Sequence, residues 1–254
     1  MKKVALLVAF GALLLPSAIF GQDDADISQA AEGGITEHVK GLFIPAVPGA
    51  PFSAKVNVEI TRKLADGNTV ARRYFVVIVR DSVGRRYRES RDPVPADSNE
   101  EPRLVRTDVT DPLTRTRTTC RPLQHTCWLF NYQPDLAPRI EPTGPAADGK
   151  SSLTRKPIGT AALNGLVAEG TEEKRTFQAG SIGNVQPIVV TNEYWYSSRL
   201  KIDLMVKRSD PRTSNQEIRV SELKLADPDP ASFATPSYYR LIDMRSVKVT
   251  STSP

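Results

Sequence analysis

The amino-acid sequence predicts a mainly β protein, a curved, open antiparallel sheet resembling half a barrel, with little helix. Apolar and polar residues alternate along residues 52–61 and again along 200–207. This period of two places one face of a strand in a core and the other near water. A third observation is that strong helical periodicity is missing throughout the chain. We therefore expect a meander of hairpins with one apolar face.

Residues 1–21 are typical of a secretory signal peptide. Lys2 and Lys3 precede an apolar run, and small residues follow it. The run is shorter than the about 20 residues that an ordinary membrane span needs; an uncleaved anchor is the alternative. The sequence therefore predicts an exported protein, periplasmic or extracellular, with no transmembrane segment after signal removal.

Residues 22–48 are expected to form a flexible acidic leader, because they carry few large apolar side chains. A single β-rich domain is expected over residues 49–250. Its first hairpin joins residues 52–61 to residues 69–80 through Asp66-Gly67-Asn68, since glycine and asparagine accept the positive φ of a tight turn. Further strands are expected at 85–91, 104–110, 113–120 and 127–132.

Cys120 and Cys127 are the two cysteines of the chain, and they flank a short segment that contains Pro122. An even number of cysteines in an exported protein favours a disulfide. We therefore predict a disulfide that closes a hairpin loop; two free thiols are the alternative. A redox role is not expected, because the close spacing of redox-active cysteine pairs is absent.

Residues 133–150 are rich in proline and glycine, which indicates a linker or a long surface loop. We favour a loop within one sheet, because neither half of the chain has an obvious second layer. Later in the chain, the alternation changes phase by one residue after Val220, as in a β-bulge. A short helix is expected after Asp229 and a closing strand from Tyr239. The other strands expected in this half are 158–164, 166–177, 188–196 and 200–207.

The second half also carries motifs that resemble a family of uncharacterised exported β-rich proteins from environmental Gram-negative bacteria. The motifs include Gly180-Ser181-Ile182-Gly183-Asn184, Trp195-Tyr196-Ser197, Asp210-Pro211-Arg212 and Asp227-Pro228-Asp229-Pro230, with Arg80-Asp81 and Gly84-Arg85 earlier. More loosely, the chain is similar to the LolA-like and RseB-like superfamily of periplasmic lipoprotein carriers and regulators. That resemblance implies a curved sheet whose concave apolar face holds acyl chains or a covering helix. The chain departs from the carriers in lacking clear long helices.

Charge and histidine content argue against several classes of function. The formal net charge is +5, which is too small to demand a nucleic-acid partner. Only His38 and His125 are present, so we expect neither a histidine base nor a histidine-rich metal site, and we predict no cofactor. Nucleophile-elbow, phosphate-loop and helical zinc patterns are missing from the sequence. A pair of carboxylates assembled by the fold is the enzymatic alternative that stays open.

An arginine-rich stretch in the first half is a candidate site for an anionic partner, because guanidinium groups pair with phosphate in a two-pronged fashion. The alternative is a solvated sheet face on which these arginines pair with Asp81, Glu89 and Asp92. The candidates are Arg72, Arg73, Arg85, Arg86 and Arg88, with Arg80 and Arg91 in the same stretch.

The leading hypothesis is a non-enzymatic protein that binds an apolar or lipidated ligand on the concave face of the sheet. It is motivated by a long apolar face with too little helix to cover it. Alternation places Trp195 on the face opposite Tyr194 and Tyr196, and core packing is the alternative to a ligand contact for these rings. The ligand-face candidates are Phe52, Val56, Val58, Tyr194, Tyr196, Leu200, Ile202, Leu204 and Val206.

The second hypothesis is a protein-interaction or sensory module whose apolar face is filled by the chain itself. Its partner would be another protein of the cell envelope, whereas the first hypothesis implies a lipid or a lipoprotein. An open pocket of several hundred Å³ favours the first hypothesis, since small-molecule sites have about that size. A dry, filled interior favours the second.

Overall fold

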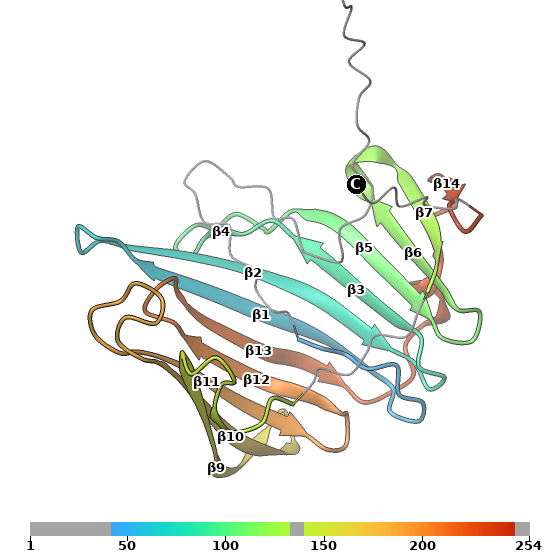
Figure 1. The fold of residues 1–254 in the computed structure, drawn as a ribbon. Coiled ribbons are helices and arrows are strands. Elements are labelled where there is room, and N and C mark those ends of the chain that lie inside the picture. The colour runs from blue at the N-terminus through green and yellow to red at the C-terminus, as the bar shows by residue number, and fades with distance from the viewer. Residues whose placement is uncertain (1–41, 133–139, 247–254) are drawn as a thin grey trace, which may run out of the picture. The chain divides into compact units, whose positions relative to one another are not determined.

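The computed structural model describes residues 42–132 and 140–246, which form one long, curved sheet (Figure 1). The predicted signal peptide and residues 22–41 of the predicted leader lie outside these ranges. The strands are β1 (Phe52–Lys63), β2 (Thr69–Arg80), β3 (Arg86–Arg91), β4 (Val94–Pro95), β5 (Leu104–Asp111), β6 (Thr116–Arg121), β7 (Thr126–Asn131), β8 (Gly144–Pro145), β9 (Ser151–Leu163), β10 (Leu166–Phe177), β11 (Ile188–Ser197), β12 (Ile202–Ser209), β13 (Asn215–Lys224) and β14 (Arg240–Asp243).

Neighbouring strands follow the order β14-β7-β6-β5-β3-β2-β1-β13-β12-β11-β10-β9-β8, and the short β4 pairs with β2. The sheet is not closed, because β14 and β8 end the order without pairing with each other. Most pairings join antiparallel strands in hairpins, whereas β14 runs parallel to β7. The predicted mainly-β, curved and open antiparallel sheet with little helix is confirmed.

The centre of the sheet is made by strands that are distant in sequence. β1 pairs with β2 on one side and with β13 on the other. The second pairing contains a β-bulge, because Lys55 lies opposite Ser221 but Ser53 lies opposite Lys224. Glu222, within the bulge, has a positive φ of 49°. The bulge predicted from the change of phase in this strand is therefore confirmed.

The hydrophobic core lies over the adjacent strands β2, β1, β13 and β12. Alternate side chains enter it because successive strand residues point to opposite faces. The tip of the β9–β10 hairpin also reaches this core, since the Asn164 amide donates to the main-chain oxygen of Val220 at 2.9 Å. The core members in the described residues are Leu42, Ile44, Phe52, Ala54, Val56, Val58, Ile60, Val76, Ile78, Leu166, Ala168, Leu200, Ile202, Leu204, Ile218 and Val220.

Residues 42–51, called the strap from here on, precede β1 and pack against the core. Leu42 and Ile44 are both buried in it. The predicted leader was therefore too long, because its last residues, 42–48, belong to the packed part of the protein. The physical reason is that two apolar side chains at alternate positions have an apolar sheet face to cover.

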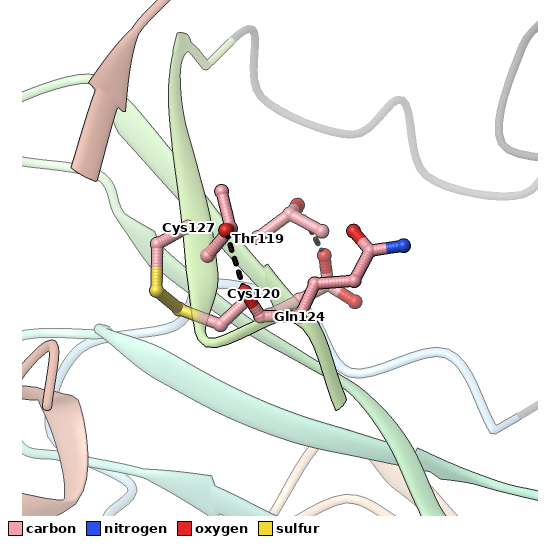
Figure 2. Close-up of a disulfide and its surroundings, with 6 residues drawn as sticks. Thr119, Cys120, Gln124 and Cys127 are labelled. Carbon is pink, nitrogen blue, oxygen red and sulfur yellow. Dashed lines mark hydrogen bonds between the residues drawn. A yellow bond between two sulfur atoms is a disulfide. The ribbon is translucent and has the colours of Figure 1, made fainter. Parts of the chain in front are cut away.

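The turn between β6 and β7 contains a short 3-10 helix, η1 (Pro122–Gln124), and is closed by a disulfide (Figure 2). Cys120 and Cys127 lie opposite each other in the ladder with their Cα atoms 4.0 Å apart. The predicted disulfide is confirmed. Beside it, the Thr119 hydroxyl donates to an Asp108 carboxylate oxygen at 2.6 Å, which joins β6 to β5.

The C-terminal part adds one more strand to the far edge of the first half. A second 3-10 helix, η2 (Pro230–Phe233), is capped by Asp229, whose carboxylate accepts a hydrogen bond from the Ala231 amide at 2.9 Å. The predicted short helix is therefore present. β14 follows as the predicted closing strand. In the proline-rich segment, residues 133–139 lie outside the described ranges, and β8 pairs with the start of β9.

Candidate functional site: the apolar face and its strap

The structure gathers most of the predicted ligand-face residues into one core. Phe52, Val56 and Val58 come from β1, and their exposed fractions are 0, 1 and 3%. Leu200, in the turn before β12, and Ile202 and Leu204, in β12, join them with 1–2% exposure. Val206 is only partly buried and packs at the margin of the core. The alternation in the sequence therefore identified the residues of one continuous apolar face.

The two tyrosines in the predicted set are placed differently. Among the aromatic residues of β11, Trp195 packs against the core, and neither Tyr194 nor Tyr196 belongs to the described core cluster. The register between β11 and β12 shifts between Trp195 and Tyr196, which places Tyr196 opposite Asp203. Tyr196 has 37% of its surface exposed. Tyr194 lies opposite Val206, which packs at the margin of the core, so a ligand contact by these two tyrosines stays a prediction.

The strap fills the centre of the apolar face. Leu42 lines a small cavity there, with a volume of about 20 Å³. A pocket for a drug-sized ligand usually measures several hundred Å³. The cavity that Leu42 lines is therefore far too small for a ligand of that size. The other residues that line the cavity are Val56, Val58, Tyr74, Val76, Ile78, Arg88 and Ile218.

The side chain of Arg80, at the end of β2, holds the strap by hydrogen bonds to the main-chain oxygens of the strap. This side chain is fully buried. Its Nε and Nη2 donate to the carbonyl oxygen of Ala50 at 2.9 and 2.8 Å, and its Nη1 donates to that of Pro45 at 3.1 Å. Nη2 also donates to the carbonyl oxygen of Leu200 at 2.6 Å. Burial and the nearby charge of Arg86 lower the pKa of Arg80 to about 10.

Arg86, at the start of β3, holds the strap at Ile44, one residue before the Pro45 that Arg80 contacts. Its Nη1 donates to the carbonyl oxygen of Ile44. From the sheet side, Nε donates to the Thr110 hydroxyl at 3.0 Å and Nη2 to the Tyr132 hydroxyl at 2.6 Å. The two arginines therefore join the strap to β5, to the segment after β7 and, through Leu200, to the start of β12.

The predicted arginine group does not form one anion-binding surface. Arg86 is buried, and Arg88 lines the small cavity. Arg85 pairs with Asp81 at 2.6 Å, as the solvated-face alternative expected. Arg73 donates to the carbonyl oxygens of Ser98 and Glu100, and Arg72 lies opposite Ile60 on β1. Alternation distributes these side chains over both faces of the sheet.

Sequence reasoning missed the strap and the role of Arg80. The available signal was the apolar triplet Leu42-Phe43-Ile44, followed by three prolines within eight residues. A second signal was that Arg80 has the same phase as Ile78 and Val76, so its side chain had to enter the core or find partners there. To interpret these two signals, one must know which residues lie opposite Arg80, and only the folded structure shows this.

One acidic group near the apolar face has a shifted ionisation. Asp203, between Ile202 and Leu204 in β12, is partly buried, and burial raises its pKa to about 6. Among the described residues, no cluster of three or more histidine, cysteine, aspartate or glutamate side chains has the arrangement of a metal site. None of the helices in the described ranges combines the length and the apolar character that crossing a membrane requires.

Comparison with known proteins found matches among solved structures. No family model and no curated protein matches the chain. The chain is similar to a structure of the MucA/MucB complex of Pseudomonas aeruginosa, with a TM-score of 0.34 and 9% identity over 75% of this chain and 58% of that one. It therefore spans less than two thirds of the chain that it matches there.

Two other similar structures are matched over more of their length. LprF from Mycobacterium bovis has a TM-score of 0.27 and 12% identity, over 71% of this chain and 90% of that one. A LolA superfamily protein from Nitrosomonas europaea has a TM-score of 0.27 and 13% identity, over 74% and 91%.

Proposed function

We propose that this chain is an exported, non-enzymatic binding protein whose apolar sheet face accepts an apolar or lipidated ligand in place of the strap. The observation that carries the proposal is the strap itself. It lies on a continuous apolar face, contributes two side chains to the core, and is held by hydrogen bonds to its main-chain oxygens. A segment held in this way is one that another apolar chain can replace.

The energetics are compatible with such an exchange. Burying Leu42 and Ile44 stabilises the closed form by about 1.5–3 kcal/mol for each side chain. Part of this gain is offset by the conformational entropy that the strap loses on packing. Segments of this kind open at a lower free energy than the core strands that they cover. A ligand that buries a long acyl chain gains about 0.8 kcal/mol for each methylene group, so a chain of ordinary length can compensate for strap release.

A second candidate is the interaction or sensory module with a self-filled core. The observation that favours it is the small volume of the cavity, about 20 Å³, beneath Leu42. In this alternative the strap is a permanent part of the core, and a protein partner binds elsewhere on the sheet. The two candidates differ in whether the strap leaves.

The first test is native mass spectrometry of the protein purified from a Gram-negative periplasm, followed by solvent extraction. Co-purification of a stoichiometric lipid or acyl species supports the ligand-binding function. A mass that corresponds to protein alone, unchanged after incubation with lipids, contradicts it and favours the self-filled module.

A strap variant tests the same point without knowledge of the natural ligand. Leu42→Ser combined with Ile44→Ser weakens the packing of the strap, whereas Pro48→Ser changes an exposed residue of the same segment. The apolar fluorescent probe N-phenylnaphthylamine should bind the double variant more tightly than wild type, with the control unchanged. Near-ultraviolet circular dichroism confirms that the double variant keeps its tertiary packing. Equal, weak binding by all three proteins contradicts an exchangeable strap.

A further inference from the structure

The loop between β10 and β11 (residues 178–187) and the first residues of β11 expose aliphatic side chains in a stretch without charge. Residues 178–192 contain no acidic, basic or aromatic residue. In this stretch, 87% of the surface of Val185 is exposed, together with 46% of that of Ile182 and 43% of that of Val189. A single exposed aliphatic side chain is ordinary on a protein surface, whereas a group of them marks a place of contact with another molecule.

The β10–β11 loop is held in one shape by Asn184. Its side-chain amide nitrogen donates to the main-chain oxygens of Gln178 and Gln186, both at 2.8 Å. Its side-chain oxygen accepts a hydrogen bond from the Ile182 amide at 3.1 Å, and its main-chain oxygen accepts one from the Gly180 amide at 2.6 Å. Because the loop is already ordered, burying its exposed side chains against a partner costs less conformational entropy.

The composition of the loop favours a lipid surface over a protein partner. The residues that dominate binding between proteins are enriched in tryptophan, tyrosine and arginine, and valine is under-represented among them. The stretch 178–192 offers only aliphatic side chains, small residues and uncharged polar groups. Contact with lipid requires this composition, because an aliphatic side chain gains free energy on leaving water whereas a charged one loses it.

The charges beside the loop do not specify an anionic surface. The Gln178 amide donates to the main-chain oxygen of Lys150 at 3.1 Å, which places the turn that contains Lys150 next to the loop. This turn also carries Asp148, and both side chains are exposed. The basic residues of β10 nearest the loop, Lys174 and Arg175, are each paired with a glutamate. Attraction to a lipid surface therefore has to come from the aliphatic side chains rather than from charge.

We propose that the β10–β11 loop docks the protein on the surface of a lipid bilayer. Ile182 and Val185 enter the boundary between the head groups and the acyl chains, and Val189 lies at the margin of the contact. The inference goes beyond the proposed function, because it concerns the surface on which the protein sits rather than the ligand on its apolar face. It does not depend on whether the strap leaves.

Flotation with lipid vesicles tests the docking of the protein purified from a Gram-negative periplasm. One set of vesicles consists of phosphatidylcholine alone, and the other of phosphatidylcholine and phosphatidylglycerol in equal parts. We expect partition coefficients for the two sets that agree within about threefold and change little with salt. Binding to neither set overturns the inference. Binding to the anionic vesicles alone, when high salt abolishes it, assigns the contact to charged residues and also overturns it.

A matched pair of variants tests whether the loop makes the contact. Val185→Ser removes an exposed aliphatic side chain from the loop, and Leu113→Ser removes one of 72% exposure from the β5–β6 turn. Since burying one such side chain changes partitioning by about tenfold, Val185→Ser should bind vesicles about tenfold more weakly, with Leu113→Ser unchanged. Wild-type binding by Val185→Ser, or an equal loss in both variants, overturns the role of the loop.

Tryptophan fluorescence provides a second measurement at the same two positions. Wild type, which contains Trp128 and Trp195, gives the baseline. When phosphatidylcholine vesicles are added, the emission of Val185→Trp should move to shorter wavelength and should be quenched by brominated acyl chains. Leu113→Trp should respond as wild type does. A response of Val185→Trp that equals that of wild type contradicts entry of the loop into the bilayer.

Discussion

At the scale of single residues, Arg80 determines how the strap is attached to the sheet. Replacing it with methionine leaves the carbonyl oxygens of Pro45, Ala50 and Leu200 without their donor. We expect Arg80→Met to lower the free energy of unfolding by about 1–3 kcal/mol, the cost of leaving buried acceptors unsatisfied. Urea unfolding followed by circular dichroism measures this, with the exposed Arg103→Met as control. A loss no larger than that of the control contradicts this role of Arg80.

Asp203 gives the protein a specific dependence on pH. Its pKa is raised to about 6 in the folded protein by burial, above the ordinary value of 3.8. Between these values the unfolded chain releases the proton that the folded protein keeps, so stability falls as pH rises from about 4 to 6. Above pH 6 the folded protein carries the full free-energy cost of burying the ionised Asp203 carboxylate.

We therefore expect Asp203→Asn to stabilise the protein at pH 7 by about 1–3 kcal/mol and to have little effect at pH 4. Unfolding free energies of wild type and variant at both pH values measure the difference. Asp97→Asn, at an exposed position, is the control. A difference between wild type and Asp203→Asn that does not change with pH shows that Asp203 ionises normally in the fold.

At the scale of elements, the β2–β3 turn supports the strap through a glycine. Gly84 has a φ of +91°, and a Cβ atom added there would lie 3.3 Å from the carbonyl carbon of Ala46. Gly67, in the β1–β2 turn, has a φ of +88° and nothing within 4 Å. The two glycines therefore share the backbone requirement but differ in the contact with the strap.

This pair makes a matched experiment. Both Gly84→Ala and Gly67→Ala should destabilise the protein by about 1–3 kcal/mol through the unfavourable φ. Only Gly84→Ala should also increase hydrogen exchange of the strap, because its methyl group presses on Ala46. Equal exchange in the two variants would show that the strap does not depend on this contact.

The disulfide stabilises the β6–β7 hairpin by restricting the unfolded chain. The loop that it closes is short, with a sequence separation of 7 residues, so the loop-entropy model gives about 2–3 kcal/mol. Replacing Cys120 and Cys127 together by serine should lower the unfolding free energy by this amount. Reductant should lower the stability of wild type similarly and leave the double variant unchanged. A reductant effect on the double variant would point to another cause.

At the scale of the whole molecule, the sequence predicted the type of fold well because each hairpin is a local pattern. Alternation in β1 and β12 identified the apolar face, and the phase change in β13 identified the bulge. The cysteine spacing identified the bridged turn. These features depend on residues close together in the chain, where periodicity and turn chemistry are sufficient.

What the sequence did not predict depends on contacts between distant segments. The strap was taken for a flexible leader because its binding surface is built by β2, β12 and the Leu200 turn. The burial of Arg80 and Arg86 follows from the same contacts. Each error came from a local pattern whose meaning was decided by a partner elsewhere in the chain.

The pairing of β1 with β13 also affects the order in which the fold can be completed. The Asn57 amide of β1 donates to the Ser221 hydroxyl of β13 across 164 positions of sequence. During synthesis the first half of the chain emerges first, so β1 can pair with β2 long before β13 exists. One side of β1 then presents an unpaired edge, which is the feature that invites association with other chains. Completion of the central sheet therefore waits for the last quarter of the polypeptide, and we expect the protein to fold slowly for its size.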